Sequence, residues 1–538
     1  MRSSFLGFEV SKRTIQLAQK ALDITGSNIS NVNTEGYTRQ RVDVSSLSLN
    51  KYTSWQTKSS RMSLAGQGST AYGVNQIRDA YIDKRYRESA CFVSQYSTTA
   101  DVLGEVETVL DNIVSDGLTY QMDKFTDALK KYAEQPDSEE LASIVRNEAY
   151  NITNLLHSYQ TDLEELKETN LEALQTTMDA TNDVIKEIVE YNKLIVNEYS
   201  VMATGKLGPN ESVTGSYGPN EMLDARNLLI DELAYYGNIS VYDNPDGSVR
   251  ILMDGVEIID GEKYEQIYMR SSTKVQNADQ FESELLRDYA AYDSAVLRWT
   301  SGDAADPASG ELRSYLDVLN GNGVYKTGYQ NDTYGIPYYE SVIDSFANDF
   351  ANHMNFLNGA IDQNGMLINK DRLLFCTQKC NEGAEDFGDH TMTADTIRIA
   401  DSWMNDATMV GEVQNPETGK WELSLDGDHI NQMAVSVTST PLKFGTKGDF
   451  EGTIYDYLLF INNRLGQQID YNKSQYESSY DTTDALLDSR DAVSGVSAVE
   501  EGINMMTYQN WYTATSRMMT TLDDCLEKLI NGTGRVGL

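Results

Sequence analysis

Cysteine, histidine and proline are scarce in this sequence, with four, four and eight of them among 538 residues. Such scattered cysteines exclude a disulfide framework, and few prolines permit long helices, because proline breaks a helix interior. No histidine belongs to an H-E-x-x-H zinc-protease motif, and neither a G-x-S-x-G nucleophile motif nor a Walker loop occurs. We therefore expect neither an enzyme nor a cofactor.

A partial metal-ligand set is the exception among these scarce residues. Cys376, Cys380 and His390 could supply three ligands to a tetrahedral metal ion. No second cysteine or histidine pair accompanies them to complete the site. We therefore expect no structural metal.

Long hydrophobic runs are also missing, and none approaches the roughly 18 residues that a membrane-spanning helix needs. The first residues, MRSSFLGFEVSKR, lack the apolar core of a secretory signal and include three charged side chains after residue 8. We expect no membrane insertion. The protein either stays in the cytoplasm or leaves by a route that reads no cleavable signal.

Basic residues are outnumbered, with 43 Lys and Arg against 82 Asp and Glu, which gives a net charge of −39. The acidic middle of the chain argues against nucleic-acid binding, because nothing there would neutralise phosphates. Residues 1–61 carry a balance of +5, whereas residues 481–538 carry −5. We expect the two ends to pack together, or against the ends of other copies, although the charges could also simply be solvated.

The N-terminal region has a helical pattern that ends abruptly in a turn. Its apolar seam has spacings of three and four residues, at Ile15, Ala18, Leu22, Thr25, Ile29 and Val32. Residues that favour turns follow, namely Asn28, Asn31, Asn33, Thr34 and Gly36. We expect extended chain over Tyr37–Val42, and on pattern alone an ordinary Asn/Gly helix cap is the favoured interpretation of the turn.

The C-terminal region repeats the same seam. Ser497–Glu500 has the spacing of a capping box, and Gly532 ends the pattern. Between them the seam comprises Met505, Tyr508, Tyr512, Thr515, Met519, Leu522, Leu526 and Leu529. Because such seams do not stay exposed to water, each terminal helix needs a helical partner.

The middle of the chain alternates helical patterns with two β-rich stretches. We predict helices over 120–132, 141–199 (as one helix or two), 336–357 and 454–491, and a helix start at Thr98–Asp101. Short strands are predicted at 396–400 and 421–425, and residues 271–335 show only a weak pattern. The predicted fold class is mainly α with inserted β modules and paired, coiled-coil-like terminal helices.

We predict four parts from these patterns. They are a terminal helical domain (1–61 and 490–538), a rod-like helical body (62–204, 336–364 and 446–489), a β-rich insertion (205–335, with a hairpin at 238–260), and a second mixed insertion (365–445).

The string NISNVNTEGYTRQ, residues 28–40, resembles the N-terminal signature of the flagellar rod, hook and hook-associated proteins. Three further stretches are similar to the hook-associated members at the junction of hook and filament. They begin KKYAEQPDSEELASIVRNEAY (residue 130), NEMLDARNLLIDELA (residue 220) and LLDSRDAVSGVSAVEEGIN (residue 486).

This resemblance implies a structural subunit that forms the hook–filament junction by self-assembly through its terminal helices. It implies a ring or helical homo-oligomer, contacts with hook protein and a second hook-associated protein, an export chaperone, and type III export to the flagellum. Another axial protein (hook or rod), or a binding role for the insertions, is the alternative. The expected assembly residues are Ile15, Ala18, Leu22, Asn28, Ile29, Asn31, Gly36, Tyr37, Arg39, Gln40, Met505, Tyr508, Tyr512, Met519, Leu522, Leu526 and Leu529.

Overall fold

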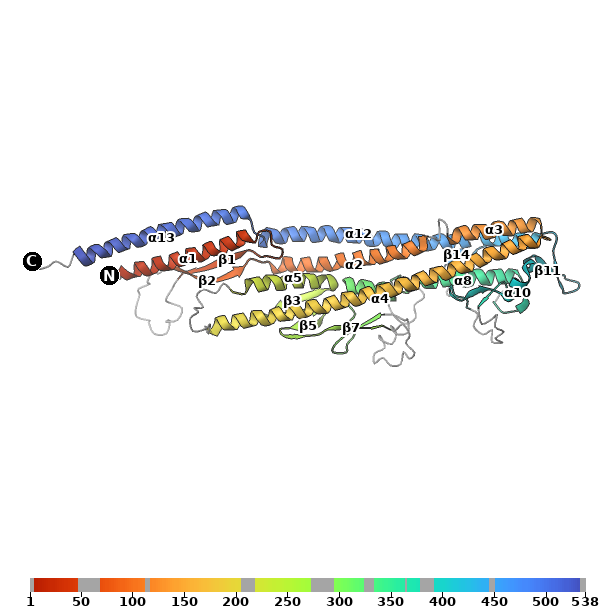
Figure 1. Ribbon diagram of the computed structural model, residues 1–538, viewed down its shortest axis with the longest axis horizontal. Helices are drawn as coiled ribbons and strands as arrows, with labels where there is room; N and C mark the ends of the chain where they lie inside the picture. The colour runs from red at the N-terminus through yellow and green to blue at the C-terminus, as the bar shows by residue number, and fades with distance from the viewer. Residues whose placement is uncertain are drawn as a thin grey trace, which may run out of the picture. The chain divides into compact units, whose positions relative to one another are not determined.

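The structure is a computed structural model that describes residues 4–46, 68–111, 117–204, 218–271, 295–323, 333–362, 365–377, 391–444 and 450–532 (Figure 1). The chain divides into two compact units. The first unit comprises Met1–Cys91, Thr181–Gln266 and Ser479–Leu538, and the second comprises Phe92–Ala180 and Ile267–Ser478. The four-part division predicted above remains a prediction.

Long helices dominate the chain, as the periodicity predicted. They are α1 (Ser4–Ser30), α2 (Ala80–Asp111), α3 (Leu118–Glu134), α4 (Glu139–Thr204), α5 (Asn220–Tyr236), α7 (Glu311–Asn320), α8 (Ile336–Leu357), α12 (Ile454–Ser494) and α13 (Ala498–Gly532). Residues 141–199, which were predicted to form one helix or two, lie in a single helix of 66 residues, α4. The fold class, mainly α with β modules, is therefore confirmed.

The helix start predicted at Thr98–Asp101 is wrong, because α2 continues through it without a break. The hydroxyl of Thr99 donates to the carbonyl of Gln95, one turn earlier in the same helix, at 2.8 Å. A threonine whose hydroxyl is satisfied in this way is tolerated inside a helix. The capping-box spacing alone does not distinguish the two situations.

The β structure of the first unit lies in two antiparallel sheets. One pairs β1 (Gln40–Ser46) with β2 (Ser69–Gln76). The other has four strands in chain order, β3 (Ile239–Asp243), β4 (Val249–Met253), β5 (Val256–Asp260) and β6 (Lys263–Tyr264). The range 238–260, predicted as a hairpin, holds β3, β4 and β5, and β6 follows it.

The second unit adds short two-stranded sheets and small helices to its bundle. The strands are β7 (Ile267–Ser271), β8 (Ala295–Trp299), β9 (Phe375–Thr377), β10 (Ile397–Ile399), β11 (Glu412–Gln414), β12 (Trp421–Leu423), β13 (Leu442–Phe444) and β14 (Phe450–Gly452). The helices are α10 (Asp401–Asn405), α11 (Asp428–Ser439), η5 (Lys370–Arg372) and η6 (Ala407–Gly411). The strands predicted near 396–400 and 421–425 are β10 and β12.

The core of the second unit is built around α8. Its residues at every fourth position, Val342, Phe346, Phe350 and Met354, are all buried. The rings of Phe346 and Phe350 stack with centroids 5.9 Å apart, and Phe350 also meets Phe125 of α3 edge-on at 6.0 Å. Burial of each such side chain contributes about 2 kcal/mol, so this stripe fixes where α8 lies in the bundle.

Candidate functional site

The two terminal helices lie side by side in the first unit and run antiparallel (Figure 1). Near the start of α1, a Cβ added at Gly7 would come within 3.1 Å of Leu522, in the second half of α13. Just after α1, Arg39 binds Glu500 and Glu501 at the start of α13. The chain therefore supplies a helical partner for each of its own terminal seams.

The face of α1 that is buried shares Ala18 and Thr25 with the predicted seam and otherwise lies beside it. Ala18 is fully buried, whereas Ile15, Leu22 and Ile29 are only half-buried and Val32 is exposed. The buried positions repeat every seven residues and are mostly small, at Ser11, Ala18 and Thr25, at Ala21 and Asn28, and at Leu17 and Ile24. Small side chains allow the neighbouring backbone to approach closely, so the larger Ile and Leu residues flank the contact.

The predicted seam of α13 corresponds to its less exposed side. Its half-buried members are Met505, Tyr508, Thr515, Met519, Leu522 and Leu526, while Tyr512 and Leu529 are 37% and 59% exposed. The rest of the helix surface carries further apolar side chains that are exposed in the single chain, namely Val499, Ile503, Met506, Trp511, Met518 and Ile530. One chain therefore covers only part of the apolar surface of α13.

The turn after α1 is held by the side chain of Asn28. Its Nδ2 donates to the carbonyl of Gln40 at 2.9 Å, and its Oδ1 accepts from the backbone N–H of Gln40 at 3.1 Å and from the hydroxyl of Tyr37 at 2.9 Å. Asn31 stabilises the helix end, since its Nδ2 donates to the carbonyl of Ser27 at 3.0 Å. An ordinary helix cap does not need these long-range bonds, so the turn is more than the end of a helix.

Two other motif segments converge on this turn. From the Asn220 motif, the carboxylate of Asp224 accepts from the backbone N–H of Thr38 at 3.2 Å, and the Nδ2 of Asn220 donates to the Oε1 of Gln40 at 3.1 Å. From the C-terminal motif, the carbonyl of Ser494 accepts from the N–H of Arg39 at 2.8 Å. Three of the four stretches that carry the sequence resemblance, those that begin at residues 28, 220 and 486, are therefore in direct contact.

Arg39 makes the strongest of these contacts. Its guanidinium binds the carboxylate of Glu501 at 2.8 Å and that of Glu500 at 2.9 Å. Glu501 is only 3% exposed, whereas the Glu500 side chain is 61% exposed. Charge-assisted bonds from arginine are strong and directional, so this pair fixes the start of α13 against the turn. The opposite charges of the two chain ends meet here.

Sequence reasoning did not identify Asn220, Asp224, Ser494, Glu500 and Glu501 as site residues. All five lie within the stretches quoted for the resemblance, so their signal was present. Asp224 contacts a turn that lies about 190 residues earlier in the chain, and Glu501 contacts it from more than 450 residues away. Nothing in the local sequence pattern shows these contacts.

Gly36 has a positive φ of 74°, a backbone shape that β-branched residues resist. There is room for a side chain, because an added Cβ would be 3.5 Å from Leu228.

We expect Gly36→Val to loosen the turn by about 1–2 kcal/mol and Gly36→Asn to be tolerated much better. Hydrogen exchange of the Tyr37 and Thr38 amides measures this. Gly26→Ala, in open space inside α1, is the control; equal exchange in all three variants would contradict the prediction.

Burial raises the pKa of the Asp224 carboxyl to about 6 from its ordinary 3.8, despite its bond from Thr38 and the nearby Arg78. A folded carboxyl with a raised pKa binds its proton more tightly than the unfolded chain does. It therefore makes the native state less stable as pH rises from about 4 through 6. Above pH 6 this amounts to at most about 3 kcal/mol.

We therefore expect Asp224→Asn to be more stable than the natural chain at pH 7.5, and to lose that advantage near pH 4. The amide oxygen can still accept from Thr38 and from Gln76, which binds Asp224 at 2.8 Å. Urea unfolding of both proteins at several pH values measures the difference in free energy of unfolding. A difference that does not change between pH 4 and 7.5 would refute the assignment.

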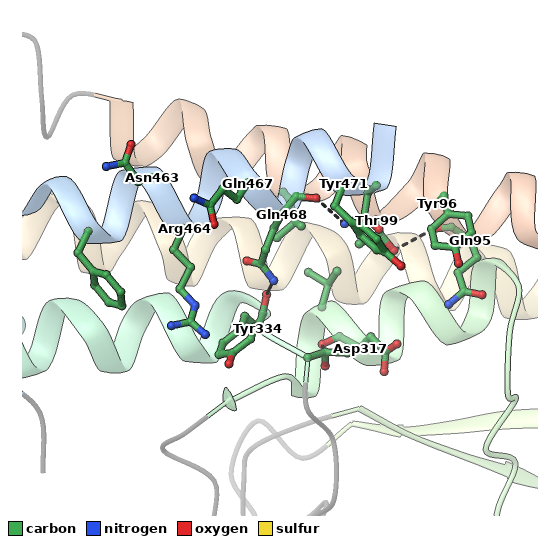
Figure 2. Close-up of a pocket in the computed structure, with 15 residues that line it drawn as sticks. Gln95, Tyr96, Thr99, Asp317, Tyr334, Asn463, Arg464, Gln467, Gln468 and Tyr471 are labelled. Atoms are coloured by element: carbon green, nitrogen blue, oxygen red, sulfur yellow. Dashed lines mark hydrogen bonds between the residues drawn. The ribbon is translucent and has the colours of Figure 1, made fainter. Parts of the chain in front are cut away.

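Figure 2 shows a cleft of about 720 Å³ in the second unit, with walls from α2, α7 and α12. Arg464 and Gln468 point toward Tyr334, whose ring centroid lies 4.1 Å from the Arg464 guanidinium and whose carbonyl accepts from Gln468 at 3.5 Å. The residues that line the cleft include no histidine, cysteine or lysine. As far as the described residues go, this cleft offers none of the usual nucleophile–base pairs.

The possible metal ligands are only partly visible. Cys376 is buried in β9, whereas Cys380 and His390 lie outside the described residues. Among the residues that are described, no group of three or more His, Cys, Asp or Glu side chains is arranged to hold a metal ion. In the same part of the chain, no helix is both long and apolar enough to cross a membrane.

Comparison with known proteins gives three family matches. Residues 103–371 match the flagellar hook-associated protein FlgK helical domain. Residues 8–38 match the flagella basal body rod protein family, and residues 491–532 match the C-terminal family of the flagellar basal body rod FlgEFG proteins. The two shorter matches cover the terminal helices described above.

Individual relatives agree with these matches. The chain is 28% identical to flagellar hook-associated protein 1 of Bacillus subtilis, with 99% of each chain covered. It is 24% identical to flagellar hook-associated protein 1 of Escherichia coli over 47% of this chain and 43% of that protein. In fold it is similar to the flagellar hook junction protein FlgK from Burkholderia pseudomallei, with a TM-score of 0.54 and 10% identity, over 76% of this chain and 100% of that one.

The FlgK helical-domain family spans half of the chain and lies between two terminal segments that match the rod protein families. The B. subtilis relative matches from end to end. The chain therefore belongs to the flagellar hook-associated protein 1 (FlgK) family.

Proposed function

We propose that this protein forms the junction between the flagellar hook and filament, and that it assembles there through the paired helices α1 and α13. Its family is one of flagellar structural proteins, so the protein is a structural component of the flagellum. The observation that carries the proposed mode of assembly is the apolar surface of α13 that a single chain leaves exposed. Neighbouring copies would cover that surface, because exposed apolar helix faces mark interaction sites.

The antiparallel pair suits a tubular assembly. α1 and α13 already cover each other along one side, so the pair can dock as a unit. Each new contact then joins different surfaces of two copies, and such contacts close into a ring or continue as a helix. The turn at Asn28–Gln40 binds α5, so the orientation of the helix pair α1 and α13 is coupled to the rest of the first unit.

Partners and export follow from this role. The terminal segments that match rod protein families favour association with other hook and rod proteins. We propose hook protein and a second hook-associated protein as the neighbours in the axial structure. Export in an unfolded state through the flagellar type III apparatus, with a chaperone, would fit the scarce cysteine.

An enzymatic role is not part of the proposal. The family is structural, and the sequence contains none of the hydrolase or nucleotide-binding motifs considered above. The helical-domain match at residues 103–371 favours the hook-associated protein over a hook or rod protein.

Deletion of the gene tests the function. We expect cells that still build hooks but carry no filaments, with filament protein found in the medium. Expression of the natural chain from a plasmid should restore filaments. Normal filaments on the deletion strain would refute the proposed position in the flagellum, and missing hooks would indicate a rod or hook protein instead.

A further inference from the structure

A cleft of about 620 Å³ in the first unit has an excess of basic side chains. Its walls come from the start of α2, from α5 and from β3. In a chain with a net charge of −39, such an excess is unexpected. The basic residues that line the cleft are Arg78, Lys84, Arg87 and Arg226, and the acidic ones are Asp83 and Asp243.

Arg226 is buried here without a carboxylate partner. The residue is 3% exposed, and its Nη1 donates to the Oδ1 of Asn192 at 2.9 Å and to the carbonyl of Gly247 at 2.8 Å. Within the described part of the chain it makes no ion pair, and its Nε lacks an acceptor. A buried guanidinium without an anion is costly, because it has lost its hydration. The pKa of Arg226 is lowered to about 10, mainly by burial and further by Arg87 and Arg78.

Arg87 is nearly as buried, at 8% exposed, and shares its carboxylate with another arginine. Its Nε binds one oxygen of Asp231 at 2.7 Å, and Arg490 binds the other oxygen at 2.6 Å. The Nη2 of Arg87 has no acceptor among the described residues. Two buried arginines that line one cleft therefore each have a buried N–H group without an acceptor among the described residues.

The carboxylates in the cleft do not neutralise these groups. Both oxygens of Asp83 bind Arg78 at 3.0 Å, so this carboxylate is already engaged. Asp243 is exposed and acts on Arg226 only at longer range. Lys84 is 62% exposed and pairs with Glu88 on its own helix at 3.6 Å, so its ammonium group can reach a bound anion.

We propose that this cleft binds an oxyanion, a carboxylate or phosphate group, through Arg226 and Arg87, with Lys84 at its mouth. Guanidinium groups bind both kinds of oxyanion through paired N–H donors. The volume lies in the range of small-ligand sites. The anion would come either from solution or from the carboxylates of a second copy, since each chain carries 82 of them. This inference does not depend on the proposed function.

Calorimetric titration of the full-length protein with citrate and with inorganic phosphate, against sodium chloride at matched ionic strength, tests the proposal. We expect saturable binding of at least one of the two anions. Lys84→Glu should weaken that binding by about tenfold, the equivalent of one charge-assisted bond. Lys130→Glu is the matched control, because Lys130 is also an exposed lysine with an acidic partner on its own helix, Asp127. It should leave binding unchanged.

Arg226→Gln should abolish binding, provided that circular dichroism shows the natural helix content; otherwise the two lysine variants decide. Absence of saturable binding, or equal weakening by Lys84→Glu and Lys130→Glu, would overturn the proposal. Sedimentation identifies the source of the anion. If a second copy supplies it, the natural chain self-associates in sodium chloride and citrate dissociates it. If it comes from solution, citrate binds a chain that stays monomeric.

Discussion

Leu522→Asp is expected to leave cells with hooks but almost no filaments, while the second unit of the purified chain keeps its melting temperature. Leu522 lies on the side of α13 that meets α1, next to Gly7. Burial of a leucine contributes about 2 kcal/mol, and a carboxylate placed there also has to lose its hydration without a partner. The loss occurs in every subunit of the assembly, so its effect on filament growth is far larger than its effect on one chain.

Electron microscopy of filaments and calorimetry of the purified protein measure the two effects. Asp523→Asn, at the exposed neighbouring position, is the matched control and should give normal filaments. Leu526→Asp should act in the same direction as Leu522→Asp. A sharp fall in the melting temperature of Leu522→Asp would show that α13 is part of a folding core, and normal filament numbers would show that this side of α13 is not needed for assembly.

Arg39→Ala is expected to release the start of α13 from the turn at a cost of about 3 kcal/mol. The substitution leaves the carboxylate of Glu501 buried, and within the described part of the chain its remaining side-chain partner is the Nδ2 of Asn504 at 3.3 Å. Removal of one partner from a buried ion pair costs more than the pair contributes, because the other charge stays in a poorly hydrated place. Hydrogen exchange of the amides in the first turns of α13 measures this local opening.

A second substitution separates this explanation from a general loss of packing. In the Arg39→Ala background, Glu501→Gln should recover part of the lost protection, because it removes the stranded charge. Arg41→Ala is the matched control, since Arg41 is 68% exposed on its side chain and binds only Asp43, at 3.4 Å. Its effect should stay below about 0.5 kcal/mol. No rescue by Glu501→Gln would show that the buried charge is not the cause.

Several elements follow from the sequence alone, because their signals are local. Phe346, Phe350 and their neighbours recur every fourth residue, and α8 begins and ends at the predicted residues. Half of the capping box predicted at the start of α13 is present, since the hydroxyl of Ser497 accepts from the N–H of Glu500 at 3.4 Å, while the Glu500 carboxylate binds Arg39. The resemblance at residues 28–40 led to the correct family, because side chains of an uncommon kind stand there in a fixed order.

Other features depend on contacts that a local pattern does not contain. The continuity of α2 through Thr98 and the helix α7 in a weakly patterned stretch come from packing, which overrides local propensity. The buried face of α1 includes only Ala18 and Thr25 of the predicted seam, because α1 packs against β1 and β2 as well as α13.

The site itself divides in the same way. The sequence by itself determined that a turn follows the N-terminal helix and that the chain ends carry opposite charge. Only the tertiary structure decided that Asp224 and Glu501 bind this turn. Periodicity reports which face of one element is buried, whereas the partner on that face is set by how the whole chain folds back on itself.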